Sequence, residues 1–236
     1  MKKKVFFCLK IFFLILMIAG LGGLISWKND KKEIESILEE TNTMIKKEEI
    51  NGEVVYSYSD QYDFYNDDTV AWLIVPNTNI NYPVVQSDNN EYYLNHNYKK
   101  KKNSAGWIFL DKDNDLLSED QNIVIYGHHR KDGIMFGDID KLMEKKYYKE
   151  NDGTIILVYA DRNDYFKIFS VYTASTEDDY TLNNYDNFKE KIQEFKNKSI
   201  IKFDNDLEEV SQIVTLSTCH NNNKDRLVVH AYRILS

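Results

Sequence analysis

Short apolar runs separated by polar and turn-forming residues recur along the chain from residue 70 onward. Runs of this kind that are rich in Val, Ile, Tyr and Phe predict β-strands. The helical spacing of Phe188, Ile192 and Phe195 predicts a helix over 187–198, and a short helical turn is expected over 90–94. Because strands predominate and do not alternate with helices, we predict a mainly β fold, a barrel of about eight strands with helical additions. The expected strands cover 70–75, 80–85, 106–110, 122–126, 155–160, 165–173, 212–218 and 226–234.

The N-terminal residues follow a different pattern. Lysines at positions 2–4 precede an apolar run over 5–26 that only Lys10 interrupts. With Lys10 reaching toward the headgroups, this run attains roughly the 20 residues that a membrane-spanning helix needs. The positive charge before it predicts a cytoplasmic N-terminus and an exported remainder. A cleaved signal peptide is the alternative, but 19–23 has small residues without an A-x-A site, so we favour an uncleaved signal anchor.

Residues 30–50 are predicted to form an amphipathic helix that packs on its own domain in preference to a partner coiled coil. Its expected apolar face consists of Ile34, Ile37, Leu38, Thr41 and Ile45. The predicted organisation is therefore a cytoplasmic tip and transmembrane signal anchor over 1–29, an N-terminal helical extension over 30–69, and a β-barrel domain over 70–236.

The composition narrows the choice of partners and singles out one thiol. A net charge of -8 argues against a nucleic-acid partner, which would call for a basic face. The chain has 2 cysteines, and Cys8 lies in the apolar N-terminal run, so Cys219 has no evident disulfide partner in its own chain. Exported domains use structural cysteines in pairs, and a lone thiol there is exposed to oxidation. Cys219 is therefore a candidate for chemistry.

Three polar residues stand at or beside the ends of predicted strands: Cys219, His128 and Arg226. A neighbouring imidazolium or guanidinium lowers the pKa of a thiol from about 8.5. A histidine can also protonate a leaving amine, and an arginine can stabilise an oxyanion. Together the three would make a thiol acyl-transfer site, although spacing along the chain does not show that they meet. A buried core cysteine, a turn-capping histidine and a surface arginine remain open as alternatives.

The remaining histidines do not have the spacing of a metal site. Zinc is disfavoured because no C-x-x-C or H-x-x-x-H pattern is present. Four of them are interpreted as ordinary surface or core residues: His96, His129, His220 and His230.

Several motifs, in order, resemble the sortase family. Residues 215–219 (TLSTC), with an arginine seven residues later that opens the strand 226–229, resemble the family's catalytic signature, and 126–128 (YGH) resembles its histidine-bearing strand end. Class B sortases in particular are similar at WLIVP (72–76), NYPVVQ (81–86), YYL (92–94), GWIFLD (106–111) and GIMF (133–136).

The resemblance implies an eight-stranded sortase-type β-barrel with N-terminal helices and a helix before the cysteine-bearing strand. It also implies that the Cys219 thiolate attacks the Thr carbonyl of a C-terminal sorting signal on a secreted surface protein. His128 would protonate the leaving amine, and Arg226 would hydrogen-bond the substrate carbonyl or its oxyanion. An amine of a peptidoglycan precursor or cross-bridge would resolve the thioacyl enzyme, and no metal or organic cofactor is required.

The same resemblance assigns a groove for the sorting signal. Asn90, Leu94, Tyr126 and Ser217 match positions that line it in class B relatives, and 177–206 would form one wall. Arg226 is preferred to Arg233 because it opens the strand beside the Cys219 loop. The expected location is the cell membrane, with a single span and an extracellular catalytic domain.

Two other readings stay open. One is a hydrolytic cysteine endopeptidase or an L,D-transpeptidase-like enzyme, although the latter usually shows S-H-G-C where this chain has Ser217-Thr218-Cys219-His220. The other is a non-enzymatic, membrane-tethered wall-binding or sensory module with an inert thiol.

Overall fold

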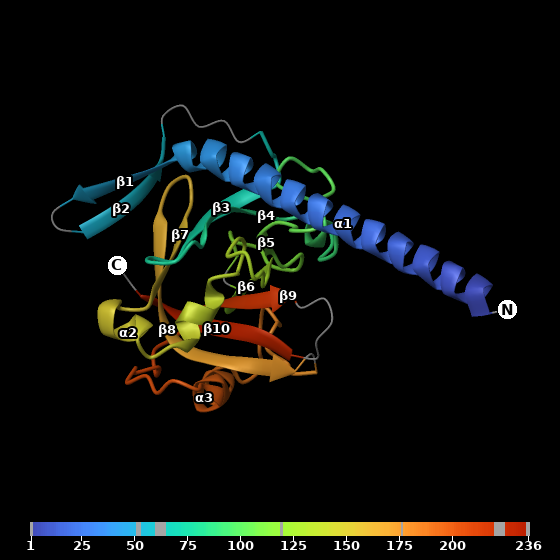
Figure 1. Ribbon diagram of the computed structural model, residues 1–236. Helices are drawn as coiled ribbons and strands as arrows, with labels where there is room; N and C mark the ends of the chain where they lie inside the picture. The colour runs from blue at the N-terminus through green and yellow to red at the C-terminus, as the bar shows by residue number, and fades with distance from the viewer. Residues whose placement is uncertain are drawn as a thin grey trace.

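The computed structural model describes residues 2–50, 53–59, 65–118, 120–175, 177–219 and 225–234. Its central feature is a closed barrel of eight strands in the order β10-β8-β7-β3-β4-β5-β6-β9 (Figure 1). These are β3 (Thr69–Ile74), β4 (Asn81–Val85), β5 (Phe109–Leu110), β6 (Asn122–His128), β7 (Thr154–Val158), β8 (Asn163–Ser175), β9 (Ile213–Cys219) and β10 (Asp225–Ile234). The mainly β, eight-stranded barrel expected from the apolar runs is confirmed.

Most neighbouring strands are antiparallel, but β4 pairs with β5 and β6 pairs with β9 in parallel. The β6–β9 ladder runs through seven residues of each strand, from the pair Asn122–Ile213 to the pair His128–Cys219. β9 pairs with β10 on its other side, antiparallel. The strands predicted to carry His128, Cys219 and Arg226 are therefore adjacent in the barrel.

A fully buried core fills the barrel and explains why these segments form strands. Trp107, Phe109 and Phe166 are 2% exposed or less, together with β-branched residues from the neighbouring strands. Such side chains pack well on a pleated surface. β5 is shorter than predicted, because its regular pairing covers only Phe109 and Leu110 of the expected 106–110. Just before it, Gly106 adopts a φ of 60°, which is not a strand conformation.

The helices lie outside the barrel. α3 (Phe188–Lys198) confirms the predicted helix, and its face formed by Phe188, Ile192 and Phe195 is buried against β8 and β10. The remaining helical elements are η2 (Tyr92–Leu94), which confirms the predicted turn, η3 (Ile139–Met143) and α2 (Tyr147–Glu150).

The N-terminal region differs from its prediction. α1 (Lys2–Thr41) is one continuous helix across the expected boundary at residue 29. It ends at Thr41, followed by η1 (Asn42–Met44), so the helix predicted over 30–50 is wrong beyond that point. β1 (Ile45–Ile50) instead pairs with β2 (Glu53–Tyr58) in an antiparallel hairpin. The hairpin prevails because Val and Tyr in β2 favour a strand, and the pairing satisfies the backbone groups of both segments.

The part of the predicted amphipathic face before this point is correct. Ile34 and Ile37 are 0% and 1% exposed, and both belong to the barrel's core cluster. The helix therefore packs on its own domain, as expected. The N-terminal part of α1 is long and apolar enough to cross a membrane, and none of that window is buried against the rest of the protein.

Candidate active site

The parallel β6–β9 pairing aligns two of the predicted catalytic residues. The Cα atoms of His128 and Cys219 are register partners, at the last pair of the ladder. Both strands end there, so the two residues lie at the same end of the barrel. The side chain of Cys219 lies outside the described parts of the chain, and so does His220, which was interpreted as an ordinary surface or core residue.

The imidazole of His128 is held by a backbone carbonyl. His128 is 6% exposed, and its Nε2 lies 2.7 Å from the carbonyl oxygen of Leu94. A carbonyl only accepts hydrogen bonds, so Nε2 carries the proton and donates it. This contact sets the orientation of the imidazole ring.

The Leu94 carbonyl is positioned in turn by a tight turn at Gly106. Gly106 has a φ of 60°, and a Cβ built there would lie 2.5 Å from the Tyr93 oxygen and 2.8 Å from the Leu94 oxygen. The backbone amide of Trp107 donates to the Tyr93 oxygen at 2.9 Å. Only glycine permits this approach without displacing the carbonyl that orients His128.

The two arginines of β10 lie at opposite ends of the strand. Arg226 and Cys219 each lie two residues beyond the β9–β10 pair Ser217–Val228, on the same side of it. Arg226 is half-buried. Arg233 instead pairs with Asp164 at 2.6 Å near the other end of β10. The structure therefore brings Arg226, and not Arg233, to the end of the barrel that carries His128 and Cys219.

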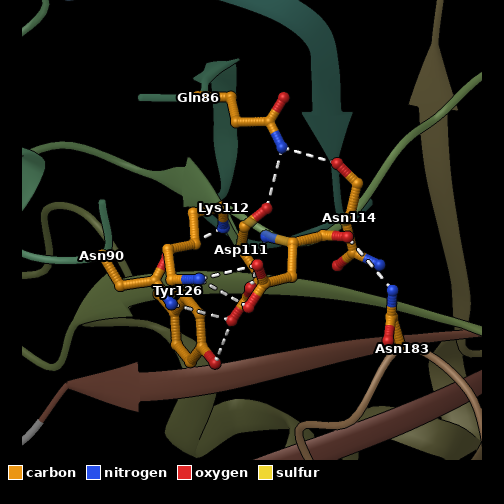
Figure 2. Close-up of polar contacts among 8 residues, drawn as sticks. Gln86, Asn90, Asp111, Lys112, Asn114, Tyr126 and Asn183 are labelled. Carbon is orange, nitrogen blue, oxygen red and sulfur yellow. Dashed lines mark hydrogen bonds and ion pairs between the residues drawn. The ribbon is translucent and has the colours of Figure 1, made fainter. Parts of the chain in front are cut away.

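Two of the four predicted groove residues share one carboxylate. Figure 2 shows Asp111 at the centre of a polar cluster, with Asn90 and Tyr126 on one side. The Oδ2 atom of Asp111 accepts hydrogen bonds from the Tyr126 hydroxyl at 2.8 Å and from Asn90 Nδ2 at 2.9 Å. The Gln86 side chain donates to the Asp111 carbonyl at 2.8 Å. Asp111 was not predicted as a site residue, because in the sequence it only opens an acidic loop.

The other two groove residues are placed differently. Leu94 is half-buried against the core and also supplies the carbonyl that holds His128. Ser217 is 1% exposed, and its hydroxyl lies 3.1 Å from the hydroxyl of Tyr180, within the segment predicted to form a groove wall. In this structure Ser217 therefore faces Tyr180 and not solvent.

The other histidines in the described residues have ordinary structural contacts, as predicted. His129 lies 2.8 Å from the Asp140 carboxylate, and His96 lies 2.8 Å from the Tyr92 carbonyl. Among the residues that the structure describes, no group of three or more His, Cys, Asp and Glu side chains is arranged to hold a metal ion.

His230 is buried in the middle of β10 and forms part of a directed chain of hydrogen bonds. Thr215 Oγ1 lies 2.6 Å from Asn122 Oδ1, a pure acceptor, so the Thr215 hydroxyl donates to it. Thr215 Oγ1 therefore accepts from Nδ1–H of His230 at 2.8 Å. His230 Nε2 then accepts from the Tyr172 hydroxyl at 3.1 Å. Asn122 Nδ2 donates to the Tyr180 carbonyl at 3.1 Å, which ties the 177–206 segment to β6.

Burial keeps this histidine neutral. His230 is 0% exposed, and its ring stacks on Phe195 with centroids 4.0 Å apart. Burial, with the nearby charges of Lys198 and Lys191, lowers the pKa of His230 to about 3. The chain from Tyr172 to Asn122 is satisfied by the neutral tautomer alone.

Comparison with known proteins places this fold and site in a family. Residues 73–234 match the sortase domain family, and the chain belongs to it. Sortase B of Listeria monocytogenes is 32% identical over 231 residues, covering 92% of this chain and 93% of the relative. Sortase B of Staphylococcus aureus is 30% identical over 174 residues, or 70% of each.

Solved structures of sortase B support the same family assignment. Sortase B from Bacillus anthracis in complex with AAEK1 matches with a TM-score of 0.73 at 30% identity, covering 88% of this chain and 99% of that one. Within the family, the chain is therefore most similar to class B sortases. Sortases are cysteine transpeptidases that sort proteins to the cell wall, and the chain is an enzyme of this class.

Proposed function

We propose that this sortase cleaves a C-terminal sorting signal at a threonine through a thioacyl intermediate on Cys219. The thiolate sulfur bonds to the threonine carbonyl carbon, and the C–N bond to the following residue breaks. His128 gives the departing amine its proton. An amine of a peptidoglycan precursor or cross-bridge then attacks the thioester and gives a proton back to His128, which forms a new amide and releases the Cys219 thiolate.

The observation that carries this proposal is the register between β6 and β9. It aligns the backbones of His128 and Cys219 across two adjacent parallel strands. Parallel strands lie about 4.8 Å apart, which is close enough for an imidazole and a thiol at paired positions to interact. The Leu94 carbonyl holds the ring of His128 in place through Nε2, and the imidazole is the group proposed to transfer a proton to the amine.

Arg226 is the group proposed to stabilise the developing oxyanion. Its place on β10, two residues from the pair that joins Val228 to Ser217, lies beside the strand end that carries Cys219. A guanidinium stays charged at any physiological pH and donates in a planar fork, which suits a carbonyl oxygen that gains negative charge. The groove for the signal is assigned to Asn90, Leu94, Tyr126 and Ser217. No metal or organic cofactor takes part in these steps.

The proposed location follows from α1. Its apolar N-terminal part is the single membrane anchor, with the lysines at positions 2–4 on the cytoplasmic side and the barrel outside the cell. The substrates are therefore secreted proteins that carry a sorting signal. The net charge of -8 favours no nucleic-acid partner.

The test is a cleavage screen of a peptide library with the full-length enzyme, followed by mass spectrometry of the trapped acyl-enzyme. Cys219→Ala is expected to abolish cleavage and the acyl adduct while the thermal unfolding midpoint stays unchanged. Cys8→Ser is the matched control, because it removes the other thiol from the exposed apolar part of α1. Full activity of Cys219→Ala would refute the proposal.

Two further measurements separate the alternatives. An added amine nucleophile should give ligated product at the expense of hydrolysed peptide, whereas a plain endopeptidase would give hydrolysis alone. For an inert thiol, the pH profile of Cys219 alkylation would be identical in the native protein and in His128→Ala, near the ordinary thiol pKa.

A further inference from the structure

The first turn of α1 after the apolar run contacts the barrel. Trp27, Asp30 and Glu33 are spaced three residues apart and so share a helix face. They contact Asn103 and Ser104, which precede β5, and Arg130, which follows β6. We call these six residues the α1 dock.

The contacts of the dock are specific and polar. The Asp30 carboxylate accepts from the Ser104 hydroxyl at 2.5 Å and from its amide at 3.2 Å. The Asn103 side chain donates to the Asp30 carbonyl at 3.2 Å and to the Glu33 carboxylate at 3.0 Å.

Arg130 completes the dock. Its guanidinium lies 5.7 Å from the ring centroid of Trp27 and is oriented by an ion pair with Asp132 at 2.7 Å. One turn further along α1, Ile34 is fully buried in the core. The dock therefore joins α1 firmly to the barrel.

The apolar run and the dock follow each other directly, without a flexible linker. The run ends at Ser26 and the dock begins at Trp27, within one unbroken helix. At about 1.5 Å per residue, Asp30 lies roughly 7 Å beyond Ile25 along the helix axis. The surface of the barrel at Ser104 therefore lies at the depth of the lipid headgroups when the run spans a bilayer.

The catalytic end of the barrel is close to the dock. Arg130 follows His128 by two residues, which span at most about 7 Å. In Figure 1, the arrow of β9 points to the side of the barrel from which the N-terminal part of α1 extends. The strand end with His128 and Cys219 therefore faces the bilayer, on the order of 20 Å from its hydrocarbon core.

The charges around the dock suit a lipid surface. Lys28, Lys32 and Lys131 are exposed, and Trp27 is 44% exposed at the boundary of the apolar run. Tryptophan favours the membrane–water interface, and lysines near it attract anionic headgroups.

We propose that the α1 dock holds the catalytic end of the barrel against the outer headgroup layer, and so favours substrates that are themselves held at the bilayer surface. This inference rests on the proposed membrane anchor. The partner is the phospholipid surface, and the dock fixes both the height and the direction of the active site above it.

A height measurement tests the proposal without using the catalytic cysteine. Lys131→Cys in a Cys8→Ser, Cys219→Ser background carries a fluorescent donor next to the dock. The full-length protein is placed in vesicles of phosphatidylglycerol and phosphatidylethanolamine that contain a headgroup-labelled acceptor. Seven polar, helix-forming residues inserted between Ser26 and Trp27 raise the barrel by about 10 Å and nearly preserve its helical phase.

The insertion is expected to lower the transfer efficiency by about two-fold or more, given a rise of this size. The same seven residues inserted after Lys4, before the apolar run, are the matched control and should leave the efficiency unchanged. Flotation with the vesicles reports the anchor itself, and failure to float would refute the proposed anchor. If the protein floats but transfer is absent, or equal in both insertions, the height inference is wrong.

Activity gives a second readout in the chain with native cysteines. Transfer to an oligoglycine on a lipid anchor is compared with transfer to the same oligoglycine in solution. The insertion after Ser26 should lower the ratio of anchored to soluble product by about ten-fold, because the site no longer meets the anchored amine. The rate with the soluble amine should be unchanged in both insertion variants. An unchanged ratio would overturn the proposal.

Discussion

Two buried histidines, in the two strands that flank β9, have different surroundings in this structure. His128 stands at the end of β6, with one ring nitrogen bonded to the Leu94 carbonyl. His230 stands in the middle of β10, with both ring nitrogens bonded to hydroxyl groups. Their exposure is nearly the same, at 6% and 0%.

This difference indicates that the position of a histidine along its strand influences its surroundings more than its burial does. In mid-strand, neighbours on both sides and α3 above hold His230, so each polar atom has a fixed partner and protonation is strongly disfavoured. At the strand end, the Leu94 carbonyl orients His128 through Nε2, and the register partner of His128 is a cysteine. A histidine that exchanges protons needs the second arrangement.

The largest expected effect is a loss of activity when His128 is replaced. His128→Ala should lower kcat/KM for peptide cleavage by about 10²- to 10⁴-fold, because it removes the proposed general acid. The adjacent His129→Ala is the control and should stay within about two-fold, since its ring contacts Asp140 away from the β6–β9 ladder. Cleavage kinetics, with thermal unfolding to confirm folding, measure both. Equal losses in the two variants would contradict the proposed role of His128.

His230 should control stability and its pH dependence. Because its folded-state pKa of about 3 lies below the unfolded value of 6.5, its contribution is complete above pH 6.5 and is lost as the pH falls. The free energy of unfolding should therefore decline between pH 6.5 and 5 by up to about 1.4 kcal/mol per pH unit. Urea unfolding across this range measures the slope.

Variants of the same chain of hydrogen bonds test this account. His230→Ala should remove that slope and lower stability by about 2–4 kcal/mol, because the Tyr172 hydroxyl loses its acceptor and the Thr215 oxygen loses its donor. Thr215→Val should have a smaller effect. It should lower the free energy of unfolding by about 1–3 kcal/mol and leave its pH dependence unchanged. Activity per folded molecule should change little in either, and a loss as large as that of His128→Ala would remove the contrast between the histidines.

A smaller effect is expected from the glycine that supports His128. Gly106→Ala would strain a φ of 60° and push on the Leu94 carbonyl. We expect a stability loss of about 2 kcal/mol and roughly a ten-fold lower kcat, because His128 loses its orientation. Gly153→Ala is the matched control, since Gly153 has a φ of 72° but contacts Tyr148 and Ile168. If both variants lower kcat equally, general strain explains the effect and not the Leu94 carbonyl.

The smallest effect concerns the groove. Tyr126→Phe removes the hydroxyl that donates to Asp111, a bond worth about 0.5–1.5 kcal/mol, so KM for the peptide should rise two- to ten-fold with kcat little changed. Tyr58→Phe removes a comparable bond to the Val158 carbonyl on the hairpin and should leave KM unchanged. Steady-state kinetics distinguish the two. A fall in kcat alone would place Tyr126 in the chemistry instead of the groove.

The local pattern of the sequence determined most of the elements. Alternating and continuous apolar runs predicted all eight barrel strands, and the spacing of Phe188, Ile192 and Phe195 predicted α3. The motifs also placed His128, Cys219 and Arg226 at strand ends and indicated the family. These features depend on the spacing and type of residues within one short segment, so they can be predicted from that segment alone.

The tertiary structure alone decided which distant groups meet. The parallel pairing of β6 with β9 aligns residues 128 and 219, and the Gly106 turn brings the Leu94 carbonyl to His128. The Asp111 carboxylate joins Asn90 to Tyr126 in the same way. The β1–β2 hairpin replaced the end of a predicted helix because cross-strand pairing outweighs local propensity. Such contacts join segments that are far apart in the chain, so the local pattern of apolar and polar residues does not predict them.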